Sequence, residues 1–154
     1  MKIRRLGERE IPRVVEFLIE RFHAEFADGL PPVSRAKVVA TVYGVWRDGF
    51  ILVAEDAGAA GGGEIVASIG VIASAPWFSD EARPTDVWTY VAPEARGGPV
   101  RGALLDAACR LAADRWQAML RVGASVGGRH AAKDRLMRRH GFQRIATLYE
   151  KQEG

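Results

Sequence analysis

The segment from Val87 to Leu105, VWTYVAPEARGGPVRGALL, limits the choice of fold more than any other part of the sequence. Its apolar first half predicts a strand that ends at Pro93, and its second half predicts a helix that follows a glycine-rich turn. A helix N-terminus exposes unpaired N–H groups and carries a positive partial charge. We therefore predict a site for a phosphate or pyrophosphate at this turn, with fixed positive charge from Arg96 and Arg101 on either side.

The length of the chain, 154 residues, corresponds to one domain, and we predict a single domain over residues 1–154. A composition of 48% hydrophobic and 27% charged residues is that of a globular protein and argues against a disordered chain. One cysteine, Cys109, excludes a disulfide framework, and we expect it to be a small buried residue. The three histidines show no metal-ligand spacing, so we predict no metal site.

The charge and hydropathy of the sequence bear on which ligands the protein binds and where in the cell it is found. The net charge of +3 suits an anionic small ligand as well as a nucleic acid and favours neither. No apolar run approaches the ~18 residues that a membrane helix needs, and the first residues, MKIRRLGERE, do not resemble a signal peptide. We expect a cytoplasmic protein that does not bind a membrane.

Hydrophobic periodicity predicts an alternation of strands and helices. The expected strands are 2–6, 50–55, 64–74, 85–92, 118–122 and 142–149, and the expected helices are 8–26, 34–46, 99–114 and 129–140. Ser34 has the character of an N-cap, and Gly141 that of a C-cap. The order β-α-α-β-β-β-α-β-α-β predicts an α/β fold with a mixed central β-sheet and helices on both faces.

A second glycine-rich stretch, DAGAAGGG over residues 56–63, has a different interpretation. No helix signal follows it, so it lacks the strand–loop–helix context that a phosphate cradle requires. We interpret it as a flexible hairpin loop between two strands.

Two motifs in this order resemble the GNAT superfamily of N-acetyltransferases. The acetyl-CoA segment of that family is a strand reading V-x-P, then R/Q-x-x-G-x-G/A, then a helix that begins with Leu-Leu. Here Val91-Ala92-Pro93, Arg96 and Ala103-Leu104-Leu105 match it. The family also ends with a helix, Gly-Phe and a strand, which resembles LMRRHGFQRIATLYEK in this chain. The whole order of expected elements agrees with the same family.

The resemblance implies a fold, a co-substrate and a reaction. Members of the family transfer an acetyl group from acetyl-CoA to an amine by direct attack, and the pantetheine arm lies between two splayed parallel strands, here 85–92 and 118–122. It implies pantetheine contacts and carbonyl polarisation by the backbone of Thr89, Tyr90 and Val91. It also implies that main-chain amides bind the pyrophosphate, namely those of Gly97, Gly98, Val100, Arg101 and Gly102.

This chain departs from the family pattern at several positions. Pro99 lies inside the loop and has no N–H to donate. His130 stands where an Asn often faces the cofactor, and we expect His130 to contact the cofactor. Met137 stands where a Tyr often acts as general acid, and methionine cannot donate a proton. Arg121 falls near the position of a Glu base on the fifth strand. Tyr90 and Ser125 are our candidates for an acid or polar partner near the thiolate.

Three further points stay open at the level of sequence. A non-catalytic module that binds CoA is an alternative to the enzyme, because the usual acid and base are missing. A nucleic-acid-binding protein is a third hypothesis, based on the basic helix 129–140, but no aromatic interleaving accompanies the charges and we favour a solvated helix face. Trp77 and Phe78 either cover the core or line an acceptor pocket. The acceptor is a small-molecule or protein amine, and the resemblance is compatible with a homodimer.

Overall fold

The computed structural model describes residues 1–58, 63–123, 130–145 and 151. The chain divides into two units, Met1–Gly123 and Ala124–Gly154, which are described separately below. The single domain predicted from the length stays a prediction. Among the described residues no helix is long and apolar enough to cross a membrane.

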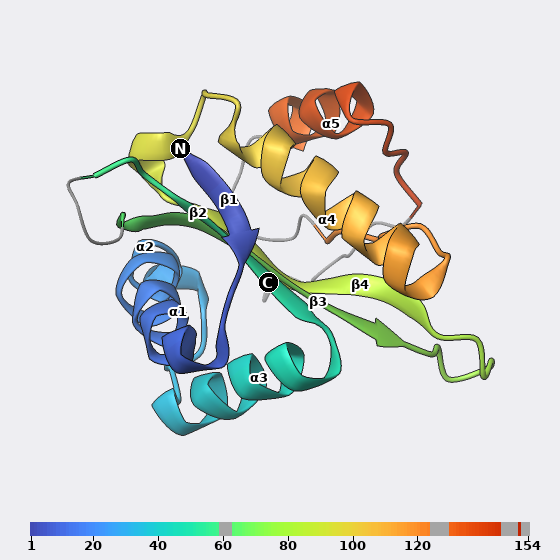
Figure 1. The fold of residues 1–154 in the computed structure, drawn as a ribbon, viewed down its shortest axis with the longest axis horizontal. Coiled ribbons are helices and arrows are strands. Elements are labelled where there is room, and N and C mark those ends of the chain that lie inside the picture. The colour runs from blue at the N-terminus through green and yellow to red at the C-terminus, as the bar shows by residue number, and fades with distance from the viewer. Residues whose placement is uncertain (59–62, 124–129, 146–150, 152–154) are drawn as a thin grey trace. The chain divides into compact units, whose positions relative to one another are not determined.

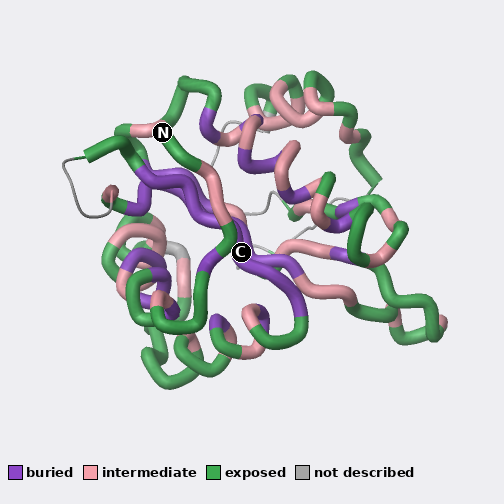
Figure 2. The backbone as a smooth tube through the Cα atoms, viewed as in Figure 1, coloured by how far each residue is buried: buried purple, intermediate pink, exposed green. Residues whose placement is uncertain are grey.

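The first unit is built on a four-stranded antiparallel sheet in which neighbours in sequence are neighbours in space (Figure 1). Its strands are β1 (Lys2–Arg5), β2 (Phe50–Glu55), β3 (Ile65–Ser74) and β4 (Arg83–Val91). All six residues of β2 and the first seven of β3 are buried, so the middle of the sheet is the centre of the core (Figure 2). Continuous apolar runs such as Phe50–Ala54 are typical of strands covered on both faces.

One face of the sheet is covered by the segments that follow β1 (Figure 1). They are the 3-10 turn η1 (Glu8–Glu10), α1 (Ile11–Phe17), the π-helical segment η2 (Leu18–His23), α2 (Ala24–Phe26), the 3-10 turn η3 (Ala27–Gly29) and α3 (Arg35–Asp48). The predicted helix 8–26 is therefore helical throughout but changes its winding three times, from 3-10 to α, to π and back to α. Val14, Val42 and Ile51 are among the residues that form the hydrophobic cluster on this face.

The other face is covered by α4 (Val100–Trp116), which follows β4 after the 3-10 turn η4 (Pro93–Ala95). Leu104, Leu105 and Ala108 lie on the inner side of α4 and are almost completely buried. Near the end of the helix the ring of Trp116 stacks on Phe50 with centroids 5.8 Å apart. Helices on both faces of the sheet were predicted, and the structure confirms this arrangement.

Local sequence signals account for two helix ends. The Ser34 side chain accepts a hydrogen bond from the Lys37 N–H at 3.3 Å, which makes Ser34 the N-cap of α3. In the second unit, α5 (His130–Arg139) is followed by Gly141, which has a φ of +81°. The N–H groups of Gly141 and Phe142 donate to the carbonyls of Arg138 and Met137, the pattern of a Schellman motif.

Two predicted strands differ from the structure. Of the strand predicted at 118–122, only Arg121 pairs with β4, through an isolated parallel bridge to Thr85. The chain turns away after Arg121 because the Gly123 N–H donates to the side chain of Asp86 instead of continuing a ladder. Of the last predicted strand, residues 142–145 have no strand pairing, and 146–149 lie outside the described residues. The predicted hairpin loop 56–63 lies between β2 and β3, and residues 59–62 are likewise outside the description.

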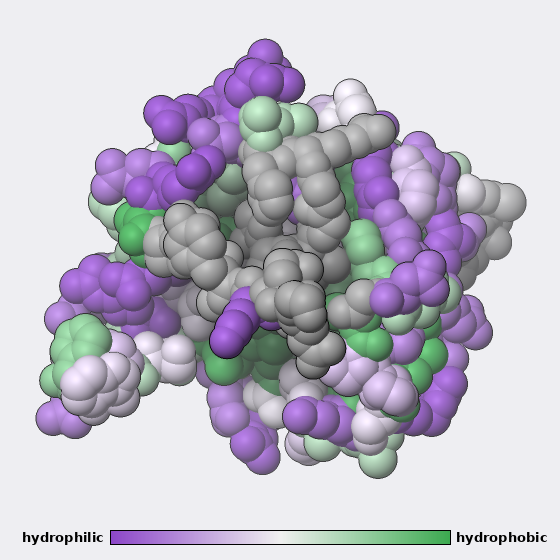
Figure 3. Space-filling view, turned by 180° about the vertical axis from the view of Figure 1, so that it is seen from behind, coloured by the Kyte–Doolittle hydropathy of each residue, from purple (hydrophilic) through white to green (hydrophobic). Residues whose placement is uncertain are grey.

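The space-filling view in Figure 3 shows hydrophilic side chains over much of the periphery and hydrophobic ones in small separate areas. Trp77 and Phe78 stand out in the loop between β3 and β4, because 97% of Trp77 and 73% of Phe78 is exposed. Their rings meet edge to face with centroids 5.6 Å apart. They do not cover the core, which decides against one of the two interpretations that the sequence left open.

Candidate functional site

A β-bulge in β4 decides which backbone groups of this strand face outward. Trp88 pairs with Gly70 and Asp86 pairs with Val71, so Val87 is the extra residue between them. Pairing in an antiparallel ladder alternates between hydrogen-bonded and non-hydrogen-bonded residues, and a bulge reverses the alternation. Before the bulge, the Asp86 N–H points away from β3 and donates to Arg121.

After the bulge the outward set changes to Thr89 and Val91. The Ala92 N–H donates to the Val66 carbonyl at 2.9 Å, which makes Ala92 and Val66 a hydrogen-bonded pair. By alternation the backbone N–H and C=O of Tyr90 also point to β3. The backbone N–H groups of Thr89 and Val91 point the other way, to the outer edge of β4. No described residue accepts a hydrogen bond from either of these two outward N–H groups. The strand therefore presents two donors without an acceptor in the described part of the chain, along the edge where the predicted pantetheine contacts lie.

At the start of β4 the same edge is paired with Arg121, and we call this part the closed end of the edge. The Arg121 N–H donates to the Pro84 carbonyl at 2.9 Å, and its carbonyl accepts from the Asp86 N–H at 3.0 Å. These two bonds are the only parallel pairing with β4 among the described residues. Among the described residues the edge of β4 is thus paired at Thr85 and has no partner from the bulge onward, which is the arrangement expected of two strands that splay apart.

The loop between β4 and α4 presents a second group of free N–H donors. The first intrahelical bond of α4 runs from the Ala103 N–H to the Pro99 carbonyl. The N–H groups of the first three helical residues and of the two preceding glycines have no acceptor among the described residues; they belong to Gly97, Gly98, Val100, Arg101 and Gly102. Gly97 has a φ of +81°, a conformation that favours glycine. We call this group the α4 cradle.

Arg101 gives the α4 cradle its charge. Its side chain is half-buried, and no described acidic residue pairs with it. Burial lowers the pKa of the Arg101 guanidinium, and the positive charge of Arg96 lowers it further. A desolvated cation beside a second cation and a helix N-terminus is a place where an anion is stabilised. Pro99 is the N-cap residue of α4, so the donor that proline lacks falls outside the helix itself.

Glu25 in α2 binds the loop that precedes α4, and no pattern in the sequence pointed to this residue. Its carboxylate accepts hydrogen bonds from Arg96 Nη1 and Nη2 at 2.6 and 2.7 Å, and from the Tyr90 hydroxyl at 2.6 Å. The hydrogen bonds from Arg96 lower the pKa of Glu25. The third donor of the guanidinium, Arg96 Nε, binds the Val91 carbonyl at 2.9 Å. The guanidinium of Arg96 is therefore engaged by Glu25 and by the Val91 carbonyl, so that it holds the loop and does not point into the cradle.

A second ion pair repeats this connection with the charges exchanged. Arg21 in η2 pairs with Glu94 in η4, just as Glu25 in α2 pairs with Arg96. The two helical residues are four apart, so they lie on the same face of their helix. The two pairs together join the helical segment on one face of the sheet to the loop that begins α4.

Tyr90 takes part in the contact between α2 and the loop before α4, because its hydroxyl donates to Glu25. Only 3% of Tyr90 is exposed, and its ring packs against Phe17, Phe22 and Phe26 with centroids 5.4 to 6.4 Å apart. Burial, followed by the hydrogen bond to Glu25, raises the pKa of its hydroxyl well above the usual range. The backbone contact predicted for Tyr90 and its acid role stay predictions, but its hydroxyl is held by Glu25.

Asp86 is a second titratable group that the sequence analysis missed. Its carboxylate accepts from the Thr89 hydroxyl at 2.6 Å and from the Gly123 N–H at 2.8 Å. Burial raises the pKa of Asp86 despite these two hydrogen bonds. An aspartate inside the apolar run TDVWTYV is the signal that could have drawn attention to it.

The roles predicted for Ser125 and His130 stay predictions. Ser125 lies outside the described residues. His130 begins α5 in the second unit, and only its backbone is described. Cys109 was expected to be buried, but it is only half-buried in α4; burial still raises the pKa of its thiol, which makes it less reactive. Within the described part of the chain, no three metal-binding side chains come together.

The sequence matches no protein-family model and no curated protein. Among solved structures, an aminoglycoside antibiotic 6'-N-acetyltransferase from Acinetobacter haemolyticus is similar with a TM-score of 0.65 and 14% identity, over 100% of this chain and 99% of that one. An acetyltransferase from Trypanosoma brucei has a TM-score of 0.67 and 17% identity, over 99% of both chains.

A third similar structure is an aminoglycoside acetyltransferase from an uncultured soil metagenomic sample in complex with sisomicin. It has a TM-score of 0.66 and 14% identity, over 99% of this chain and 96% of that one. These structural neighbours are acetyltransferases, and the α/β arrangement of a four-stranded antiparallel sheet with helices matches the GNAT acetyltransferase fold. The fold implied by the two sequence motifs is confirmed.

Proposed function

We propose that the protein transfers an acetyl group from acetyl-CoA to the amine of an acceptor by direct attack. The observation that carries the proposal is the continuity of two sets of free N–H donors. The outward amides of Thr89 and Val91 lead along β4 to the α4 cradle, where Arg101 lacks an acidic partner among the described residues. An extended amide-containing arm that ends in a diphosphate matches this sequence of donors.

Acetyl-CoA supplies the activated acetyl group when it is bound; the residues of this chain bind and orient it. The α4 cradle holds the diphosphate through main-chain N–H groups and the charge of Arg101. The free edge of β4 pairs with the amides of the arm, as a neighbouring strand would. One outward N–H, from Thr89 or Val91, stabilises the negative charge that develops on the thioester oxygen.

The acceptor amine must lose a proton before or during the attack. Asp86 lies next to the bulge, its carboxyl is partly desolvated, and the hydroxyl of Thr89 links it to the open edge. A carboxyl with a raised pKa can accept a proton at neutral pH, directly or through water. We propose Asp86 as the group that receives the proton of the amine.

A non-catalytic CoA-binding module is the second candidate function. It is favoured by Met137, which stands in α5 at the position of the usual general acid. Calorimetric titration with acetyl-CoA and a thiol-release assay over a panel of amines, including an aminoglycoside, separate the candidates. Binding with turnover supports the enzyme, and binding without turnover on any amine supports the module.

Absence of binding at millimolar acetyl-CoA contradicts both of these functions. Salt-sensitive binding of a random oligonucleotide would then favour the nucleic-acid hypothesis based on α5. The cytoplasmic location and the homodimer stay predictions.

A further inference from the structure

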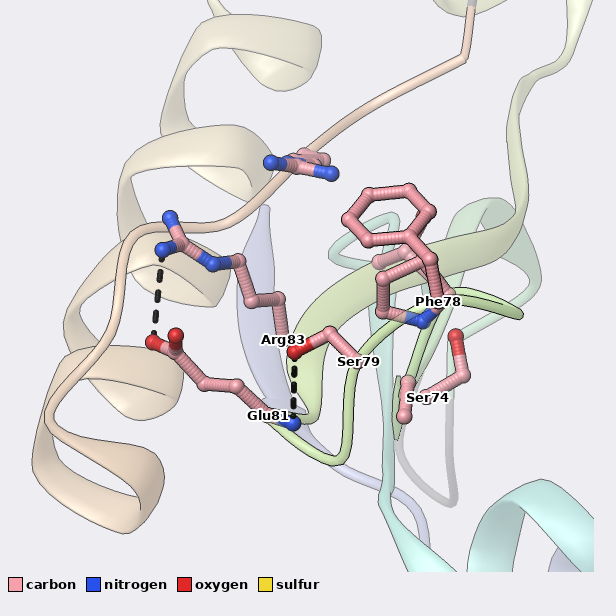
Figure 4. Close-up of a pocket in the computed structure, with 9 residues that line it drawn as sticks. Ser74, Phe78, Ser79, Glu81 and Arg83 are labelled. Atoms are coloured by element: carbon pink, nitrogen blue, oxygen red, sulfur yellow. Dashed lines mark hydrogen bonds and ion pairs between the residues drawn. The ribbon is translucent and has the colours of Figure 1, made fainter.

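A pocket of about 420 Å³ lies beside the end of β4 that is opposite to the α4 cradle. Its walls come from the connection between β3 and β4, from the start of β4, and from Arg121 (Figure 4). Ala75, Pro76 and Phe78 form its apolar part. Two arginines, one glutamate and three hydroxyl side chains form its polar part.

The position of the pocket relates it to the proposed reaction. Thr85, which lines the pocket, pairs with Arg121 at the closed end of the β4 edge. A strand rises about 3.3 Å per residue, so the pocket end of β4 at Thr85 is roughly 20 Å from Val91. An arm that starts at the α4 cradle and follows the free edge through Val91 and Thr89 therefore carries its reactive end toward this pocket.

The charges of the pocket are not balanced. Arg83 pairs with Glu81 at 3.2 Å, and Glu81 is further fixed by a bond from its N–H to the Ser79 hydroxyl (Figure 4). No described acidic residue pairs with the side chain of Arg121. Its backbone is held by two hydrogen bonds to β4, so the position from which this guanidinium extends is fixed. The pocket is left with one positive charge that has no partner in the described part of the chain.

The apolar part of the pocket adds a second requirement. Phe78 presents its ring to the pocket, and Trp77 supports that ring edge to face. Aromatic side chains as exposed as these two are typical of binding surfaces. A ligand that fits both parts carries an anionic group for Arg121 and an apolar group for Phe78.

We propose that the acceptor is a small amine that also carries a carboxylate and an apolar side chain, bound in this pocket with its carboxylate on Arg121. The inference rests on the proposed function. In the reaction the amine nitrogen forms a bond to the acetyl carbon, and the carbon–sulfur bond breaks. The ammonium gives up two protons, one to the departing thiolate and one to Asp86 or water. The products are an N-acetylated carboxylate and CoA.

The first experiment measures binding without turnover. N-acetyl-L-phenylalanine and N-acetyl-L-phenylalaninamide differ only in the carboxylate, and each is titrated by calorimetry into the full chain. We expect the acid to bind about tenfold to a hundredfold more tightly than the amide, because a charge-assisted pair replaces a neutral contact. Arg121→Gln removes this preference. Arg110→Gln, at an exposed position on α4, preserves it.

Thermal unfolding of the variants keeps this comparison interpretable. The backbone bonds of Arg121 are unchanged in Arg121→Gln, so its melting temperature stays close to that of the wild type. Equal binding of the acid and the amide to the wild type overturns the proposal. A preference that survives in Arg121→Gln overturns it as well.

The second experiment tests whether the ligand is the acceptor. L-phenylalanine and phenethylamine are compared in the thiol-release assay with acetyl-CoA. A value of kcat/KM at least tenfold higher for phenylalanine, lost in Arg121→Gln, supports the proposal. Turnover that is equal for the two amines overturns it. A failure to bind acetyl-CoA at all contradicts the proposed function instead, and the carboxylate preference is then decided by the first experiment alone.

Discussion

Arg96 and Glu25 lie 71 positions apart and form a bidentate ion pair, with both guanidinium nitrogens on the carboxylate at 2.6 and 2.7 Å. The pair fixes the loop before α4 from the direction of α2. Because the α4 cradle begins one residue after Arg96, the order of the loop and the affinity of the cradle should depend on Glu25.

Glu25→Gln should weaken acetyl-CoA binding more than it weakens the fold. Glutamine still accepts from Tyr90, but it loses the charge that holds Arg96. Because the side chain of Arg96 is 39% exposed, solvent screens the pair, and we expect the free energy of unfolding to fall by only ~0.5–1 kcal/mol. The dissociation constant for acetyl-CoA, measured by calorimetry, should rise about threefold to tenfold.

Glu16→Gln is the matched control for that variant. It breaks a more exposed ion pair, with Arg35, in the same helical segment and away from the loop. An equal loss of acetyl-CoA affinity in Glu16→Gln and Glu25→Gln would contradict a specific role for Glu25.

Arg101→Gln should weaken acetyl-CoA binding without destabilising the fold. The guanidinium of Arg101 is half-buried beside Arg96, and burial lowers its pKa, so its removal relieves an unfavourable charge. We expect the free energy of unfolding to stay constant or to rise slightly, and the dissociation constant for acetyl-CoA to rise at least tenfold. Arg110→Gln on the same helix should change neither quantity. Destabilisation of Arg101→Gln by more than ~1 kcal/mol would indicate a structural role instead.

Gly97 and Gly98 offer a test of the shape of the loop. Gly97 has a φ of +81°, where a Cβ is unfavourable, whereas a Cβ at Gly98 would come no closer than 3.9 Å to the Ala95 carbonyl oxygen. Gly97→Ala should lower the free energy of unfolding by ~1–2 kcal/mol in urea denaturation. Gly98→Ala should change it by less than ~0.5 kcal/mol. Equal effects of the two substitutions would argue against the left-handed conformation at Gly97.

The pH dependence of stability should carry a contribution from Asp86. Burial raises its folded-state pKa above the unfolded value, so between the two values the folded protein binds more protons than the unfolded chain. Stability from this group is therefore present below the unfolded pKa, near 3.9, and is lost as the pH rises through the raised folded value. Urea denaturation at a series of pH values measures this loss.

Asp86→Asn should remove that contribution. We expect the difference in unfolding free energy between Asp86→Asn and the wild type to shift in favour of the variant as the pH rises. Asp114→Asn, at an exposed position on α4, serves as the control. A difference that does not change with pH would show that Asp86 titrates alike in the folded and unfolded chain.

The elements with local signals could be predicted from the sequence. The strand 50–55 has the predicted bounds, and Ser34 and Gly141 occupy the two caps that their residue types indicated. Each of these features depends on residues a few positions apart, so periodicity and capping rules are sufficient. The turn before α4 was predicted for the same reason.

Features that depend on distant segments could not be predicted in this way. The pairing of Glu25 with Arg96 follows from the packing of α2 against the sheet, and no local pattern marks either residue. The bulge at Val87 exists only relative to Gly70 and Val71 on the neighbouring strand. The strand expected at 118–122 is reduced to Arg121 because Asp86 captures the Gly123 N–H, a tertiary contact that overrides strand propensity.

The π-helical segment Leu18–His23 means that the number of residues in this helical segment decides which way its later side chains point. A π-turn adds a residue to an α-helical path and shifts the rotational phase of everything that follows. Removal of one residue from this segment would turn the later side chains by about 100° around the axis. The carboxylate of Glu25 would then no longer point toward the guanidinium of Arg96. Homologous chains that keep the ion pair should therefore tolerate substitutions in this segment far better than deletions.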